Sequence, residues 1–140
     1  MDDWPATGWP VARLVGLAEG SPGEEVCGLL VRAGGNVDCW PVRNVAPEPA
    51  RAFELAPLEL LAALRRLELE GAELVAVYHS HLAGGAELSP RDLAGALVDG
   101  APVLPGAAQL VLGLERGRVT AVRVHRWTGA GFASSEPGFR

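Results

Sequence analysis

The 140-residue chain contains no lysine, so all twelve of its basic residues are arginines. Aspartate and glutamate together number 17, which leaves a formal net charge of −5 at pH 7. Nucleic-acid binding depends on neutralising phosphates with clustered basic side chains. The charge balance therefore argues against a nucleic-acid-binding protein. Without lysine, the chain cannot itself be conjugated through a lysine side chain.

Cysteine is scarce as well, because only Cys27 and Cys39 occur. Two cysteines make no disulfide framework and match no zinc-finger spacing, so we expect two small apolar residues in a reduced cytosol. No apolar run approaches the roughly 20 residues of a membrane-spanning helix. The acidic N-terminus also lacks the charged start and apolar stretch of a signal peptide. These absences predict a cytoplasmic protein without a membrane segment.

Apolar residues, by contrast, make up 49% of the chain, enough for a proper core. A chain of this length buries roughly two-thirds of its unfolded surface as one domain. We therefore expect a single domain over residues 1–140, with its core at about 10–127. The tail at 128–140, rich in glycine, serine and proline, is expected to be loose.

Helical and strand-like patterns interleave along the chain. Helices are predicted after Pro10, from Pro57 with an inward stripe of Leu60, Leu61, Leu64 and Leu67, and over residues 89–99. Strands are predicted at 24–31, 37–42, 74–78, 107–113 and 119–127, the first two as a hairpin. This order favours an α/β fold with one mixed sheet and helices packed on it.

A compact polar motif follows the apolar strand at 74–78. His79 and His81 lie two residues apart, so in a strand their side chains point the same way and can bind one ion together. Asp92 can supply a carboxylate if the chain turns back between Leu82 and Leu88. Three such ligands with a fourth position left for water are typical of a catalytic zinc, whereas structural zinc sites are closed by four ligands.

Simpler interpretations exist for the same residues. Ser89 and Asp92 also match a helix start, with serine as N-cap, Pro90 at the first position and an acid in the first turn. That role is compatible with metal binding, because it would fix the direction of Asp92. His125 lies in a late strand of alternating character and is assigned a structural role. An amide hydrolase also needs a base, and spacing alone cannot find it among seventeen acids.

The spacing His79-x-His81, seven residues, Ser89, two residues, Asp92 resembles the signature of the JAMM/MPN+ metalloprotease (JAB domain) family. The segment Glu25-Val26-Cys27-Gly28 resembles the family's glutamate-bearing stretch, and the similarity covers roughly residues 10–127. The resemblance implies a single MPN-type domain whose mixed sheet is flanked by helices in a cytidine deaminase-like architecture.

The resemblance also implies roles for individual residues. His79, His81 and Asp92 would bind one Zn²⁺ per chain. Glu25 would act as general base on the water and then protonate the leaving amine, and Ser89 would steady the oxyanion. Glu24 is the neighbouring rival for the base, and the two side chains should face opposite ways if both lie in the strand.

The family resemblance implies a metallopeptidase or isopeptidase acting on the C-terminal tail of a ubiquitin-like or β-grasp sulfur-carrier protein. Leu82 and Leu88 stand where the family commonly has proline, which bears on substrate fit more than on chemistry. The substrate and the oligomeric state are left open.

Three other classes of protein compete with this interpretation. A non-catalytic MPN scaffold is the main alternative, although such relatives usually lack one or more metal positions. A DNA-repair relative with a similar histidine pair is disfavoured by the acidic charge. A zinc nucleoside deaminase would need H-x-E and P-C-x-x-C motifs, and neither occurs.

Overall fold

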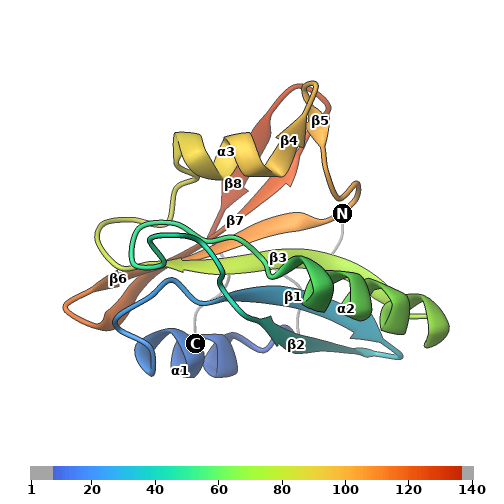
Figure 1. The fold of residues 1–140 in the computed structure, drawn as a ribbon, viewed down its shortest axis with the longest axis horizontal. Helices are drawn as coiled ribbons and strands as arrows, with labels where there is room; N and C mark the ends of the chain where they lie inside the picture. Colours follow the sequence, from blue (N-terminus) through green and yellow to red (C-terminus); the bar gives the residue numbers. More distant parts are fainter. Residues whose placement is uncertain (1–7, 137–140) are drawn as a thin grey trace.

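The computed structural model describes residues 8–136. Its main sheet contains β1 (Cys27–Ala33), β2 (Asn36–Val42), β3 (Glu73–His81), β6 (Ala108–Glu115), β7 (Arg118–Trp127) and β8 (Phe132–Ser135). The helices are α1 (Val11–Glu19), α2 (Pro57–Leu69) and α3 (Pro90–Ala96), and a small hairpin joins β4 (Leu97–Val98) to β5 (Ala101–Pro102). Figure 1 shows the sheet between α1 on one side and α3 on the other.

The six strands follow the order β2-β1-β3-β6-β7-β8. Only the central pair, β3 and β6, is parallel, and the other neighbours run antiparallel. A parallel pair needs a crossover, and here the crossover carries α3 and the small hairpin. The predicted mixed sheet with helices packed on it is therefore confirmed, and the carboxyl end of β3 leads directly into the segment that returns as α3.

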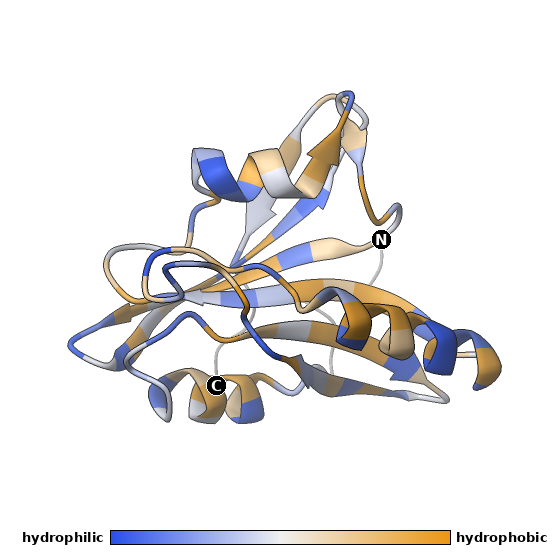
Figure 2. Cartoon of the chain, in the orientation of Figure 1, coloured by the Kyte–Doolittle hydropathy of each residue, from blue (hydrophilic) through white to orange (hydrophobic). Residues whose placement is uncertain are grey.

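The two faces of the sheet carry separate apolar clusters. On one face, Leu14 of α1 packs in a cluster with Leu30, Tyr78 and Leu110. On the other face, Leu60 of α2 packs against a cluster that includes Val77. Successive residues of a strand point to opposite faces, which explains why neighbours in β1 and β3 fall into different clusters. Figure 2 shows β3 changing from hydrophobic to hydrophilic toward its C-terminal end.

Several predicted elements differ from the structure. The predicted helix over 89–99 ends at Ala96, because Asp99 and Gly100 have φ values of 51° and 78° and form the turn of the β4–β5 hairpin. Asp-Gly is a strong two-residue hairpin signal, and in the structure it stops the helix. The predicted strand at 24–31 begins only at Cys27, so Glu24 and Glu25 both precede it.

Two further expectations need correction. The tail was expected to be loose from residue 128, but Phe132–Ser135 forms the edge strand β8 against β7; residues 137–140 lie outside the described part. In α2, Leu61 is 47% exposed, so the inward stripe consists of Leu60, Ala63 and Leu67.

Cys27 and Cys39 are both free and buried, in agreement with their predicted role as small core residues. Between residues 8 and 136, no helix has the length and apolar character needed to cross a bilayer.

Candidate metal centre

Two histidine side chains leave the carboxyl end of β3 on the same face of the sheet. Their Nε2 atoms lie 3.1 Å apart. Asp92 Oδ2 lies 3.1 Å from Nε2 of His79 and 3.0 Å from Nε2 of His81. His79 is fully buried, while His81 borders a cavity of about 300 Å³. The structure thus brings together the three residues that the sequence predicted as metal ligands.

Asp92 reaches the histidines because it begins α3. The Ser89 hydroxyl accepts a hydrogen bond from the Asp92 amide at 3.0 Å, and Asp92 Oδ2 accepts one from the Ser89 amide at 2.9 Å. This reciprocal arrangement is a capping box, with Pro90 in the first helical turn. The predicted helix start is therefore confirmed, and it fixes the direction of the Asp92 carboxylate.

The hydrogen bond of His81 to the backbone fixes the tautomer of its ring, and so decides which nitrogen presents a lone pair to His79 and Asp92. Nδ1 lies 3.2 Å from the carbonyl oxygen of Gly85. A carbonyl oxygen only accepts, so Nδ1 carries the hydrogen of the neutral ring and Nε2 presents a lone pair. That lone pair faces the Asp92 carboxylate and Nε2 of His79. A metal ion between them would bind all three atoms; without one, the hydrogen of a neutral His79 ring on Nε2, or a proton on His81, bridges to the Asp92 carboxylate.

The spacing of the three atoms fits a metal ion. Zinc–nitrogen distances of about 2.0–2.1 Å with tetrahedral angles give ligand–ligand separations of roughly 3.3 Å. The observed separations of 3.0–3.1 Å come close to this value. Among residues 8–136, His79, His81 and Asp92 are the group of three metal-ligating side chains with converging atoms. The residues present therefore suit zinc.

The electrostatics favour the metal-binding protonation state at Asp92 and His79, whereas His81 must lose a proton before it binds a metal ion. Burial alone would raise the pKa of the Asp92 carboxyl, but the hydrogen bonds from His79 and His81 outweigh it and hold that pKa well below its usual range. Burial lowers the pKa of His79, which keeps this ring neutral. For His81, burial is outweighed by the Asp92 carboxylate, so its pKa is raised in the metal-free protein. A proton on His81 is the cation that a metal ion would replace.

A buried glutamate lines the same cavity. Glu25 is only 5% exposed, and within residues 8–136 its Oε1 atom has no hydrogen-bond partner. The cavity wall also includes His81, Ser89 and Asp92. Burial raises the pKa of Glu25 to about 7. Its neighbour Glu24 is exposed and borders a different cavity on the α1 side, so of the two acids only Glu25 lies beside the triad.

The backbone around Glu25 is held on both sides. Its amide donates to the Pro49 carbonyl at 2.7 Å, and its own carbonyl accepts from the Asn44 side chain at 2.9 Å. The next residue, Val26, donates its amide to the hydroxyl of Ser80 at 2.9 Å and accepts from the Ser80 amide at 3.0 Å. Ser80 lies between the two histidines in β3, so the glutamate segment is tied directly to the strand that carries them.

Sequence reasoning missed three residues that support the site. Asn44 and Ser80 hold the backbone at Glu25, and the ring of Phe53 stacks on His79 with centroids 4.2 Å apart and planes at 20°. A serine between two histidines of a strand was one available signal, because it must point to the opposite, core-facing side. The segments that contain Asn44 and Phe53 also resemble the family, but the resemblance gave neither residue a role.

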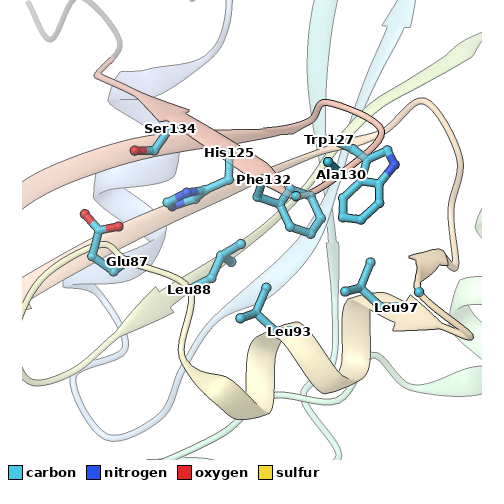
Figure 3. A pocket seen from close by; sticks show the side chains of 11 residues that line it. Glu87, Leu88, Leu93, Leu97, His125, Trp127, Ala130, Phe132 and Ser134 are labelled. Carbon is cyan, nitrogen blue, oxygen red and sulfur yellow. The ribbon is translucent and has the colours of Figure 1, made fainter.

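A second, larger cavity of about 490 Å³ lies between α3 and the strands β7 and β8. Figure 3 shows Leu93 of α3 and Leu97 of β4 pointing toward Trp127 and Phe132. His125 forms part of the wall, and its Nε2 donates to the Ala86 carbonyl at 2.9 Å. His125 thus lies outside the triad and supports the loop before α3, in line with the structural role predicted for it.

Comparison with known proteins identifies similar chains. The family described as prokaryotic homologs of the JAB domain matches residues 11–128. A Thermus thermophilus protein named probable TtuB-protein conjugate cleaving protease is 53% identical over 53 residues, 38% of this chain and 36% of that protein. A Haloferax volcanii protein named desampylase is 37% identical over 121 residues, 82% of this chain and 78% of that protein. The match to the Thermus relative thus spans little more than a third of its length.

A solved structure has a similar fold. The solution structure of a protein from Desulfitobacterium hafniense superimposes with a TM-score of 0.69 at 24% identity, covering 89% of this chain and 84% of that one. At this level of identity the likeness concerns the fold alone.

Proposed function

Because the chain belongs to the prokaryotic JAB-domain family, we propose that it is a zinc-dependent isopeptidase that releases ubiquitin-like modifiers from protein conjugates. Two named relatives support this proposal, since one is called a desampylase and the other a conjugate-cleaving protease. The scissile bond would be an amide at the C-terminal tail of a ubiquitin-like or β-grasp sulfur-carrier protein. The proposed enzyme is a single domain over residues 1–140.

His79, His81 and Asp92 would hold the ion through the two Nε2 atoms and Oδ2. A zinc ion bound there acidifies a water molecule and polarises the carbonyl that is to be attacked. The Gly85 carbonyl keeps the hydrogen of His81 on Nδ1 and so leaves Nε2 free to bind. The capping box restrains the Asp92 carboxylate in the same way.

Glu25 would take the proton of the attacking water at its carboxylate and return it to the leaving amine. A base whose pKa lies near the working pH serves both steps well, and burial raises the pKa of Glu25 to about 7. The Ser89 hydroxyl accepts one hydrogen bond from the Asp92 amide, which leaves its own hydrogen available for the oxyanion of the tetrahedral intermediate.

One observation carries the proposal. The three converging ligand atoms and a buried glutamate without a hydrogen-bond partner for Oε1 border the same cavity. Burying a carboxyl group without a hydrogen-bond partner costs free energy, and a cation beside it would offset that cost. A scaffold protein that only binds partners would have no use for this arrangement.

The test combines metal analysis with an assay on a ubiquitin-like protein fused through its tail to a reporter protein. We expect about one zinc per chain, lost in His79→Ala and Asp92→Ala and retained in Glu25→Ala, which should lose turnover. His125→Asn serves as the matched histidine control and should keep its zinc.

The alternative outcomes discriminate between parts of the proposal. Undiminished hydrolysis by Glu25→Ala would overturn the assignment of the base. A protein that binds no zinc even when zinc is supplied would instead be a non-catalytic scaffold.

A further inference from the structure

We propose that Asn44 is a positioning residue that fixes the proposed base, Glu25, relative to the histidine ligands. The inference rests on the proposed function. Asn44 follows β2 and lies 19 residues from Glu25 in sequence; its segment Arg43-Asn44-Val45-Ala46 resembles the family's second strand and its exit, but the resemblance gives Asn44 no role.

The side chain of Asn44 forms hydrogen bonds to two separate segments. Its Nδ2 donates to the carbonyls of Glu25 and Ala52, both at 2.9 Å, with the Pro49 carbonyl at 3.4 Å. Its Oδ1 accepts from the amides of Ala46 and Glu54, both at 3.0 Å. The partners fix the orientation of the amide, because carbonyls face only the nitrogen and amides face only the oxygen.

These bonds connect the backbone at Glu25, the proposed base, to the loop at 46–54. The backbone on both sides of Phe53 is held, through the carbonyl of Ala52 and the amide of Glu54. Phe53 in turn stacks on His79, with centroids 4.2 Å apart. One side chain therefore links the residue that would take the proton to the aromatic ring that stacks on a candidate metal ligand.

The position of the Glu25 side chain depends on this support, because its own carboxyl group forms few hydrogen bonds that could hold it. Within residues 8–136, Oε1 forms no hydrogen bond, so the direction of the side chain follows from the position of its backbone. Asn44 at the carbonyl and Pro49 at the amide hold that backbone, and Pro49 belongs to the same loop. A displacement of about 1 Å in a reacting group can cost about 100-fold in rate.

Two substitutions separate the functions of the side chain. Asn44→Asp keeps the oxygen that accepts from Ala46 and Glu54 but loses the donor to the carbonyls of Glu25 and Ala52. Asn44→Ala loses both. The chain offers a matched control in its other asparagine, Asn36, which is exposed at the start of β2. Asn36→Asp therefore makes the same chemical change at a remote place.

The first measurement is steady-state hydrolysis of the ubiquitin-like fusion, with zinc content determined for every variant. We expect Asn44→Asp to lower kcat about 10- to 100-fold with KM and zinc content unchanged, and Asn36→Asp to behave as the parent. In a Glu25→Gln background, Asn44→Asp should cause no further loss, because it acts through Glu25. In a Ser89→Ala background the loss should remain.

The second measurement is amide hydrogen exchange, which does not require activity. In Asn44→Asp, the Glu25 amide should exchange at least about 10-fold faster than in the parent, while the amides of Ala46 and Glu54 keep their protection. Asn44→Ala should expose all three amides.

The two measurements separate the inference from the function it rests on. Unchanged exchange at Glu25, or an equal kcat loss in the Glu25→Gln background, would overturn the positioning role. Absence of hydrolysis by the parent protein would overturn the proposed function, and the exchange data would then decide alone whether Asn44 holds Glu25.

Discussion

Replacing Glu25 by glutamine should stabilise the metal-free protein progressively as the pH rises. Burial raises the pKa of this carboxyl group from 4.5 to about 7. In the unfolded chain the same group titrates near its ordinary value. Between these two pKa values the unfolded state loses its proton while the native state keeps it. Glutamine carries no proton that can titrate and so removes this difference.

The sign and size of the effect follow from proton linkage. Where the native state binds more protons than the unfolded state, the free energy of unfolding falls as pH rises. Each pKa unit is worth about 1.4 kcal/mol, so a shift from 4.5 to about 7 amounts to at most about 3 kcal/mol. The free energy of unfolding of Glu25→Gln minus that of the parent should therefore increase by up to about 3 kcal/mol between pH 4.5 and pH 8.

The assay is urea denaturation of both proteins across this pH range in the presence of a chelator. Any constant cost of burying the glutamine amide cancels, because only the change with pH is compared. His79, His81 and Asp92 are present in both proteins, so most of their contribution cancels as well. Glu24→Gln is the matched control, since it removes the same charge at an exposed neighbouring position.

Two outcomes would refute the reasoning. A difference that stays flat with pH would mean that the Glu25 carboxylate is not disfavoured by burial. An equal rise in Glu24→Gln would mean that overall charge, and not the cavity, controls the effect. Added zinc should reduce the rise, because a cation beside Glu25 favours its ionised form.

Three further substitutions probe the support of the site. Ser89→Ala should lower the free energy of unfolding by about 1 kcal/mol through loss of the helix cap, and should lower kcat by about 100-fold or more. Ser89→Thr should keep the cap. Equal kcat values in the parent, Ser89→Ala and Ser89→Thr would exclude an oxyanion role. Gly113→Ala would place a methyl group 2.6 Å from the Gly85 carbonyl that orients His81. Chelator competition should therefore show about 10- to 100-fold weaker zinc binding. Gly131→Ala is the control and should bind zinc as the parent does. Gly28→Ala would place a methyl group against the Trp40 carbonyl and 2.6 Å from the Tyr78 ring, and should cost about 1–3 kcal/mol in urea denaturation. A cost no greater than that of Gly16→Ala would contradict this steric argument.

The candidate metal triad was the most predictable arrangement of side chains in the molecule, for a physical reason. His79 and His81 share a strand face by simple alternation, and Asp92 follows only eleven residues later at a helix start with its own sequence signal. All three positions depend on local conformation. The predicted family and mixed sheet are likewise confirmed by the family match and the strand order.

Residues that act at long range could not be predicted in the same way. Nothing in the local sequence distinguishes Glu25 from the other sixteen acids, and only the family resemblance selected it. Asn44 was missed because most of its partners are backbone groups that come together only when β1, β2 and the following loop have folded. The edge strand at Phe132–Ser135 was missed because so short a segment forms a strand only by pairing with β7.

The distribution of the site along the chain also affects the order in which its parts form during folding. The candidate ligands occupy one stretch, residues 79–92, whereas Glu25 arrives through antiparallel pairing of β1 with β3, and Val26 and Ser80 are 54 positions apart. Contacts between distant residues form late, since a long loop must close first. A chain whose β1 is undocked would thus retain the segment with the candidate ligands while lacking the proposed base. Metal retention would then report on local order between β3 and α3, and turnover would report on completion of the sheet.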